Sequence, residues 1–334
     1  MTHALADELA HFAETERCPH LAPIIARLRR PVEVAVLGRN GVGGSTVAAA
    51  LRQWGVVVLP DGVGAEASDV RVLVIAEAVK PEDQRALTSS SQPTVIVLTK
   101  ADLAGSGPGG PMAAARRRAA AIQLTTGLPT VPMIGLLAAL DGPEALDDGL
   151  VDTLRSFVTE PADLTSVDAF LDGPHPVGRD VRARLVERLD RFGIAHAVLG
   201  LADGCEPGEL ITRLRDLGNL DEVMSALEVA AAQVKYLRIC AARSELRALA
   251  VRFDDDRMAA LVAANNTALA AMTAAVEVVE ATGLAVDRRD TRPAHLGRAI
   301  HWHRYGRGPV NALHRRCSDD IVKGSLVLVT EQST

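Results

Sequence analysis

A glycine-rich segment that follows a short apolar run most strongly limits how this 334-residue chain can fold. The segment is PVEVAVLGRNGVGGST, residues 31–46, and its valines and leucine predict a buried parallel strand over 31–37. A glycine-rich turn follows, and the residues from 45 to 54 read as a helix. A strand, a glycine loop and a helix in this order direct backbone N–H groups and the positive helix end toward a phosphate.

The loop fits the phosphate-loop pattern G-x-x-x-x-G-K-[ST] except at one position. Gly38 and Gly43 have the required spacing, and Ser45 stands where a hydroxyl ligand of Mg²⁺ is expected. Position 44 is glycine, so the lysine that neutralises phosphate charge is missing. The sequence leaves two interpretations open. Either the loop still binds a phosphate, or it is a turn that only ends the strand. The residues expected at the phosphates are Gly38, Asn40, Gly41, Gly43, Gly44, Ser45 and Thr46.

A second motif follows the apolar run of residues 91–103. Its end, Thr99-Lys100-Ala101-Asp102, fits [NT]-K-x-D directly after a strand. An aspartate in this place can accept hydrogen bonds from N1 and N2 of guanine, and the lysine stem can lie along the base. We therefore expect Thr99, Lys100 and Asp102 to form a guanine site. The loop after the next strand, near Ile134, is expected to touch the base through its backbone.

A weaker motif lies between these two. The apolar run from residue 55 leads into Asp61-Gly-Val-Gly64, which fits D-x-x-G, an element that places an aspartate near Mg²⁺. Since DG pairs are common turn formers, a plain strand-ending turn is an equal alternative. If a metal binds, Ser45 and Asp61 are its expected ligands.

Alternation of strand and helix predicts an α/β domain over 31–160 with a parallel sheet covered on both faces. The pattern then changes, and 175–330 reads as a helical bundle, which the N-terminal helical segment 1–30 is expected to join. Within 219–250 the apolar positions predict one stripe that includes Leu220, Leu237 and Leu249.

Charge and cysteine usage exclude some classes of protein. The net charge of −6 does not suit a general nucleic-acid binder. Four scattered cysteines read as reduced thiols, and no apolar run approaches the length of a membrane span. We therefore expect a cytoplasmic protein, with a peripheral membrane role left open.

The spacing between the motifs bears on catalysis. Only residues 47–60 separate Thr46 from Asp61, and one helix and one strand fill that space. No segment remains for a first switch that senses the γ-phosphate. Because phosphoryl transfer depends on positioned charge, loss of both the lysine and this switch predicts little or no hydrolysis.

The order GRNGVGGST, DGVG, TKAD and VPMIGLLAAL resembles the bacterial dynamin-like branch of the translation-factor-type P-loop GTPases. The helical segments RLVERLDRFGIAHAVLGL and HWHRYGRGPVNALHRRCSDDIVKGSLVLV are similar to the helices that follow the GTPase domain in that family. The resemblance implies a Ras-like P-loop domain, GTP or GDP with Mg²⁺ as cofactor, and self-association or pairing with another GTPase. With the lysine replaced, it implies a pseudo-GTPase that regulates an active paralogue.

Three alternatives stay open. The first is a slow GTPase that a partner activates in trans. The second is a MinD/ParA-like ATP-binding protein, in which Arg39 takes the place of the signature lysine of K-G-G-V-G-K-[ST]-T. The third is a purely structural helical protein with a relict α/β domain. A metal site at His301, His303, His314 and Cys317 has weak spacing, and packing or solvated histidines are the simpler interpretation.

Overall fold

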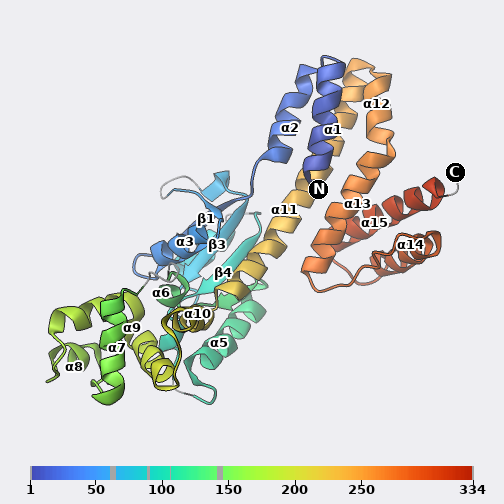
Figure 1. Ribbon diagram of the computed structural model, residues 1–334. Coiled ribbons are helices and arrows are strands. Elements are labelled where there is room, and N and C mark those ends of the chain that lie inside the picture. The colour runs from blue at the N-terminus through green and yellow to red at the C-terminus, as the bar shows by residue number, and fades with distance from the viewer. Residues whose placement is uncertain (1, 61–64, 89–90, 106, 141–145, 333–334) are drawn as a thin grey trace. The chain divides into compact units, whose positions relative to one another are not determined.

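The computed structural model describes residues 2–60, 65–88, 91–105, 107–140 and 146–332. Its contacts divide the chain into two compact units (Figure 1). We call Glu33–Leu227 the sheet unit, and Met1–Val32 together with Glu228–Thr334 the bundle unit. Each unit is described by itself.

The sheet unit is built on five parallel strands in the order β2-β1-β3-β4-β5. All six positions of β3 are buried, as a parallel strand covered on both faces requires. This sheet confirms the predicted α/β arrangement. The apolar run from residue 55 forms a strand of only two residues, and the D-x-x-G motif at Asp61 lies outside the described residues. The strands are β1 (Glu33–Gly38), β2 (Val57–Val58), β3 (Val70–Ile75), β4 (Thr94–Leu98) and β5 (Thr130–Pro132).

Eight helices belong wholly to the described part of the sheet unit. The chain passes from β1 through α3, and from β4 through α5, before each following strand, as parallel strands require. The helices are α3 (Gly44–Gln53), α4 (Pro81–Thr88), α5 (Gly110–Thr126), α6 (Gly135–Ala138), α7 (Asp148–Thr159), α8 (Val167–Asp172), α9 (Arg179–Ala202) and α10 (Pro207–Gly218).

The boundary between the units differs from the expected one at residue 175. Helices α7 to α10 bury their apolar faces in one core with α6 and the segment after β5. Ile134 and Leu137 from that segment pack in the same cluster as Leu154, Leu189 and Leu214. Because these helices have no separate core, they belong with the sheet rather than with the bundle.

The bundle unit gathers helices from both ends of the chain. Leu5 and Leu9 of the N-terminal helix share a core with Leu246, Val278 and Trp302, so this helix joins the bundle as expected. Breaks divide the predicted helical region from residue 256 to residue 331 into four helices. The helices are α1 (Thr2–Thr15), α2 (Ala22–Arg29), α11 (Leu220–Phe253, which begins in the sheet unit), α12 (Asp256–Ala263), α13 (Asn265–Ala281), α14 (Arg292–Gly306) and α15 (Ala312–Glu331).

No single helix in the described ranges is long and apolar enough to cross a membrane. Helices α12 and α13, which bend by 41° at the break between them, reach that length and apolarity only as a pair. Several side chains of this pair, including Met258, Ala274 and Val279, are buried in the bundle core.

Candidate functional site

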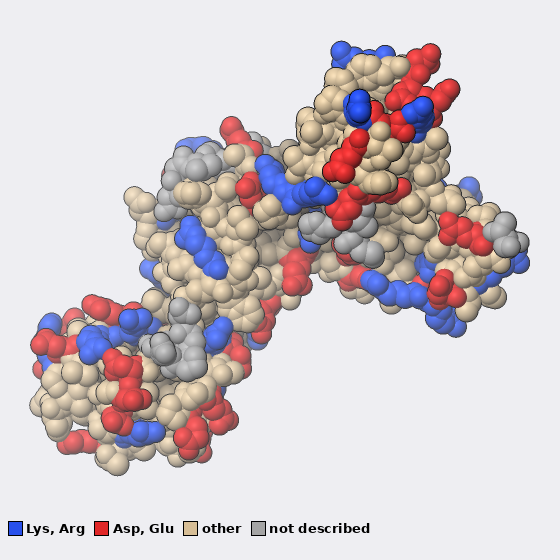
Figure 2. Space-filling model, turned by 45° about the horizontal axis from the view of Figure 1, so that its top comes forward, with Lys and Arg blue, Asp and Glu red and all other residues tan. Residues whose placement is uncertain are grey.

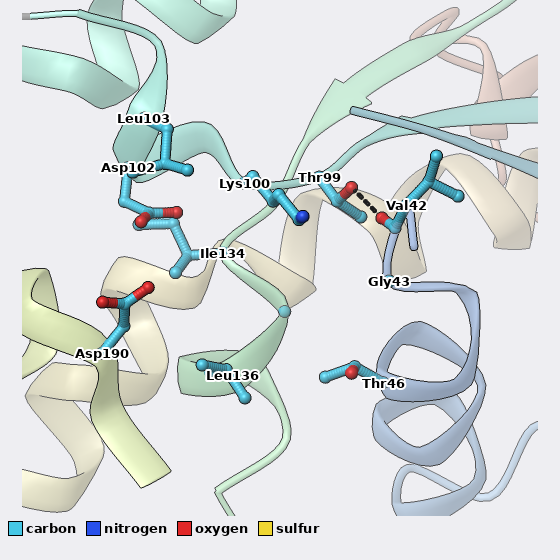
Figure 3. A pocket seen from close by; sticks show the side chains of 11 residues that line it. Val42, Gly43, Thr46, Thr99, Lys100, Asp102, Leu103, Ile134, Leu136 and Asp190 are labelled. Carbon is cyan, nitrogen blue, oxygen red and sulfur yellow. Dashed lines mark hydrogen bonds between the residues drawn. The ribbon is translucent and has the colours of Figure 1, made fainter. Parts of the chain in front are cut away.

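A cavity of about 180 Å³ opens at the carboxyl ends of β1, β4 and β5 (Figure 3). In open parallel sheets, ligands bind at this edge. The cavity is smaller than the roughly 300 Å³ of a typical drug-sized site, and it suits a single planar base better than a whole nucleotide. Its lining comes from three separate segments and one helix: Val42, Gly43, Thr46, Thr99, Lys100, Asp102, Leu103, Ile134, Gly135, Leu136 and Asp190.

The side chain of Thr99 joins the two main motifs. Its buried Oγ1 lies 2.5 Å from the carbonyl oxygen of Val42 in the glycine loop and 3.0 Å from that of Ile75 at the end of β3. A hydroxyl has one proton, so it donates to one of these carbonyls at a time. Figure 3 shows the contact with Val42 as a dashed line. Thr99 thus fixes the glycine loop against the end of β4 and does not face the cavity as a free donor.

Lys100 adopts a backbone conformation that residues other than glycine rarely take. Its φ is 54° and its ψ is 40°, in the left-handed region. The turn it makes starts the short 3₁₀ segment Ala101–Leu103, which carries Asp102. Strained positions of this kind persist where the surrounding structure requires them, and they gather at functional sites. The exposed Lys100 side chain lies between Asp102 and the glycine loop (Figure 3).

Asp102 is partly buried in the wall of the cavity. Loss of solvent raises the pKa of its carboxyl, and the nearby charge of Asp190 raises that pKa further. The hydrogen bond from its own backbone N–H and the charges of Lys100 and Arg191 lower the pKa but do not cancel the increase. In the ligand-free protein the ionised form of Asp102 therefore has too few hydrogen-bond donors and positive charges around it to offset its burial. A ligand that brings N–H donors stabilises the ionised form.

The loop after β5 contributes the side chains of Ile134 and Leu136 and the backbone of Gly135 to the cavity. The N–H of Ile134 donates to the carbonyl oxygen of Gly218 at 3.1 Å, so it is already used within the fold. The Ile134 side chain lines the cavity. A Cβ on the next residue, Gly135, would lie 3.3 Å from Cγ2 of Thr46, so a larger residue would fit only if the Thr46 side chain shifted by a few tenths of an ångström.

The glycine loop has the backbone geometry of its motif. Gly41 and Gly43 have φ values of 81° and 93°, which glycine adopts without steric cost. A Cβ on Gly38 would lie 2.8 Å from the carbonyl oxygen of Val74, so only glycine allows this close approach to β3. Gly44, in contrast, opens α3, and a Cβ there would meet nothing within 4 Å. The missing lysine is therefore not excluded by space.

The expected metal site is not assembled by the described residues. Ser45 is exposed in the first turn of α3, and its expected partner Asp61 lies outside the described residues. No group of three or more His, Cys, Asp or Glu side chains in the described ranges is placed to hold a metal ion. The first turn of α3 itself contains no acidic residue that would compete for its N-terminal N–H groups.

Arg39 is occupied elsewhere. Its Nε lies 3.3 Å from Oδ1 of Asp83, which is only 2% exposed in α4. The same carboxylate accepts a hydrogen bond from the N–H of Lys80 at 2.9 Å. A guanidinium that neutralises a buried carboxylate is held away from the role of a phosphate-binding cation.

Six of the residues predicted from the sequence come together in the lining of the cavity: Gly43, Thr46, Thr99, Lys100, Asp102 and Ile134. Gly38, Asn40, Gly41, Gly44 and Ser45 lie in or beside the glycine loop but outside this lining. Asp190 was not predicted as a site residue, because its segment reads as an unbroken helix. Comparison of the chain with protein-family models, curated proteins and solved structures returned no match.

Proposed function

We propose that this chain is a dynamin-like pseudo-GTPase that retains a guanine-nucleotide site and has little or no hydrolytic activity. The observation that carries the proposal is the cavity in which Thr46 at the start of α3, the Lys100–Asp102 turn and the loop at Ile134 meet. These segments lie far apart in the sequence. Their meeting at one sheet edge supports the interpretation of TKAD as a base-recognition motif rather than a chance turn.

The same cavity favours guanine over adenine. A carboxylate accepts hydrogen bonds and, while ionised, donates none. The N1 and N2 groups of guanine offer N–H donors on one edge, and Asp102 presents its acceptor oxygens in the cavity wall. The phosphates would then lie toward Gly43 and the N-terminus of α3, where backbone N–H groups and the helix dipole favour negative charge.

Two features support weak turnover. Gly44 supplies no cation, and Arg39 is bound to Asp83. Transfer of a phosphoryl group requires charge placed at the leaving and transferred oxygens, so loss of this charge slows the reaction by several orders of magnitude. The Arg39 contact also disfavours the MinD/ParA-like alternative, which needs that side chain at the phosphates.

The experiment is a thermal-unfolding series of the full chain with Mg²⁺ and GTP, GDP, ATP or no nucleotide. Ligand at about 100 times Kd adds about 2.7 kcal/mol of stability, which gives a clear rise in Tm. A rise with GTP and GDP but not with ATP is expected. A rise with ATP alone would replace this proposal with the ATP-binding alternative, and no rise with any nucleotide would leave the α/β unit a relict.

The regulatory part of the proposal concerns a GTPase paralogue that pairs with this chain. Mixing the two proteins is expected to change the paralogue's rate of GTP hydrolysis. The slow-GTPase alternative predicts instead that part of the stimulated rate comes from this chain. Repeating the mixture with Asp102→Ala in this chain distinguishes the two hypotheses. If this chain is itself a slow GTPase, the substitution removes its share of the stimulated rate of hydrolysis. If it only regulates the paralogue, no such share exists to be removed.

A further inference from the structure

Asp190 reaches the cavity because α9 is interrupted at this residue. Within Arg179–Ala202, Asp190 alone has non-helical backbone angles, with φ 53° and ψ 176°. Arg191 fixes the chain on the far side of the break: its Nη1 donates to the carbonyl oxygens of Leu164 at 3.0 Å and of Thr165 at 2.6 Å. The break is therefore a defined part of the fold.

One oxygen of Asp190 is used locally. Its Oδ1 accepts a hydrogen bond from the N–H of Arg191 at 2.6 Å. A helix-capping aspartate normally accepts from the N–H two or three residues ahead, so this bond does not account for the residue as a cap. No group of the described residues donates a hydrogen bond to the second carboxylate oxygen, and the side chain lines the same cavity as Asp102 (Figure 3).

Two carboxylates thus approach one hollow, and Lys100, a cation in the same lining, lies on the glycine-loop side of Asp102 rather than between the two. In Figure 3 the carboxylate of Asp190 is turned toward the end of the cavity that holds Asp102 and Ile134. The charge of Asp190 disfavours ionisation of Asp102, which is a second sign that the two groups are close. The Arg191 guanidinium, the nearest candidate partner along the chain, is engaged with the Leu164 and Thr165 carbonyls. A ligand rich in N–H donors relieves this repulsion.

Resting on the proposed guanine site, we infer that Asp190 is a second specificity-determining residue, which accepts a hydrogen of the exocyclic 2-amino group. Guanine has three N–H hydrogens on this edge: one at N1 and two at N2. Asp102 accepts the N1 hydrogen and one N2 hydrogen. The other N2 hydrogen points away from Asp102, and Asp190 supplies an acceptor from a separate element of the cavity wall.

This arrangement selects among related bases. Hypoxanthine has the N1 hydrogen but no amino group, so it leaves Asp190 unsatisfied. Xanthine carries a carbonyl oxygen in place of the amino group, and that oxygen faces a carboxylate. Discrimination of this kind is strong, because a buried or half-buried charged group left without its partner weakens binding much more than a lost apolar contact.

The test compares GDP, IDP and XDP, each with Mg²⁺, by calorimetry on the full chain and on Asp190→Asn. Asparagine has nearly the same shape and tolerates a positive φ, so the kink is kept. In Asp190→Asn we expect GDP to bind about tenfold more weakly and IDP to bind about as before, so that the GDP/IDP affinity ratio falls about tenfold. XDP is expected to gain affinity, because the amide offers it a donor.

Asp190→Gly is the second variant, because it removes the carboxylate and fits the positive φ without strain. The same fall in the GDP/IDP ratio is expected. An unchanged ratio in both variants, with GDP still bound by the parent chain, would overturn the role of Asp190 and leave the guanine site standing. Failure of the parent chain to bind any guanine nucleotide would overturn both the proposed guanine site and the role of Asp190. The Tm of each ligand-free variant is the control for folding, and the GDP/IDP ratio is compared only in a variant that keeps the Tm of the parent chain.

Discussion

The base end and the phosphate end of the candidate site differ in what the fold has kept. At the base end, Lys100 is held in a strained turn and the pKa of Asp102 is raised, which are features that reduce the stability of an empty site. At the phosphate end, the loop shape is kept, but position 44 lacks a cation and Arg39 is bound to Asp83. The comparison shows that separate segments place the side chains proposed to recognise a base and those that would act on a phosphate, so one set can change without the other.

The largest expected effect comes from Asp102→Ala, which removes the acceptor at the base end. Two hydrogen bonds to a charged group are each worth about 1.5–3 kcal/mol, so GDP affinity should fall more than 100-fold. Calorimetric titration with GDP measures this loss. The unfolding of the ligand-free variant is the control, and its Tm should not fall by more than a few degrees. Retained GDP affinity would show that the base end does not recognise guanine.

The next effect tests the phosphate end by supplying what it lacks. Gly44→Lys places an ammonium group at the start of α3, where a Cβ has open space. We expect GDP and GTP affinity to rise about tenfold, since the lysine contacts phosphate oxygens. Gly44→Ala is the matched control, because it gains the same helical preference without the charge. An equal change in both variants would mean that the phosphates lie elsewhere.

Arg39→Ala separates a structural arginine from a phosphate ligand. The substitution leaves the buried carboxylate of Asp83 with only the Lys80 N–H as a described partner. We expect a loss of about 1–3 kcal/mol in the free energy of unfolding, measured with urea, and an unchanged Kd for GDP. Arg39→Ala combined with Asp83→Asn should recover part of the stability. A fall in nucleotide affinity without a fall in stability would assign Arg39 to the phosphates.

The smallest effect is the response of the base end to pH. Because the folded-state pKa of Asp102 is raised, its ionised form lowers stability above that pKa, and this cost disappears as the pH falls through it. GDP needs the ionised form, so its affinity should fall as the pH drops through the same pKa. The charged groups that act on Asp102 are Asp190, which raises the pKa, and Lys100 and Arg191, which lower it.

Titrations of GDP binding between pH 4 and pH 8 test this prediction. In Asp190→Asn the midpoint should move to lower pH, because the repulsion is gone. In ligand-free Asp102→Asn the stability at neutral pH should rise slightly, because the substitution removes an ionised carboxylate that burial and the charge of Asp190 disfavour. A midpoint that does not respond to Asp190→Asn would show that the two carboxylates do not interact.

Much of the sheet unit was predictable because its signals are local. The strands 31–37 and 91–103 and the loops that follow them are encoded by short apolar runs and turn residues, and parallel strands bring such loops to one edge. The two-residue β2 was not predicted, because an apolar run indicates burial but not how many residues pair with β1. The break at Asp190 was hidden because it lies inside a good helical pattern.

The bundle shows a second limit of sequence reasoning. The predicted apolar stripe of α11 holds from Leu220 to Val234 and again at Leu246, but Leu237 is 37% exposed, and Tyr236, Ile239 and Ala242 are buried in that region instead. The residues of α11 after Leu227 belong to the other unit. An apolar stripe predicted with one helical period does not show where along the helix the packing partners change. The acidic and basic side chains that cover both units (Figure 2) give no clear signal of this division either.

Helix α11 begins at the wall of the cavity. Asn219, just before this helix, donates through Nδ2 to the carbonyl oxygen of Pro132 at 2.7 Å, at the end of β5, and the carbonyl of Gly218 accepts from the cavity residue Ile134. The helix has 34 residues and continues past Leu227, where the second unit begins. The segment that leaves the sheet unit is therefore anchored by hydrogen bonds to the same loop that lines the cavity.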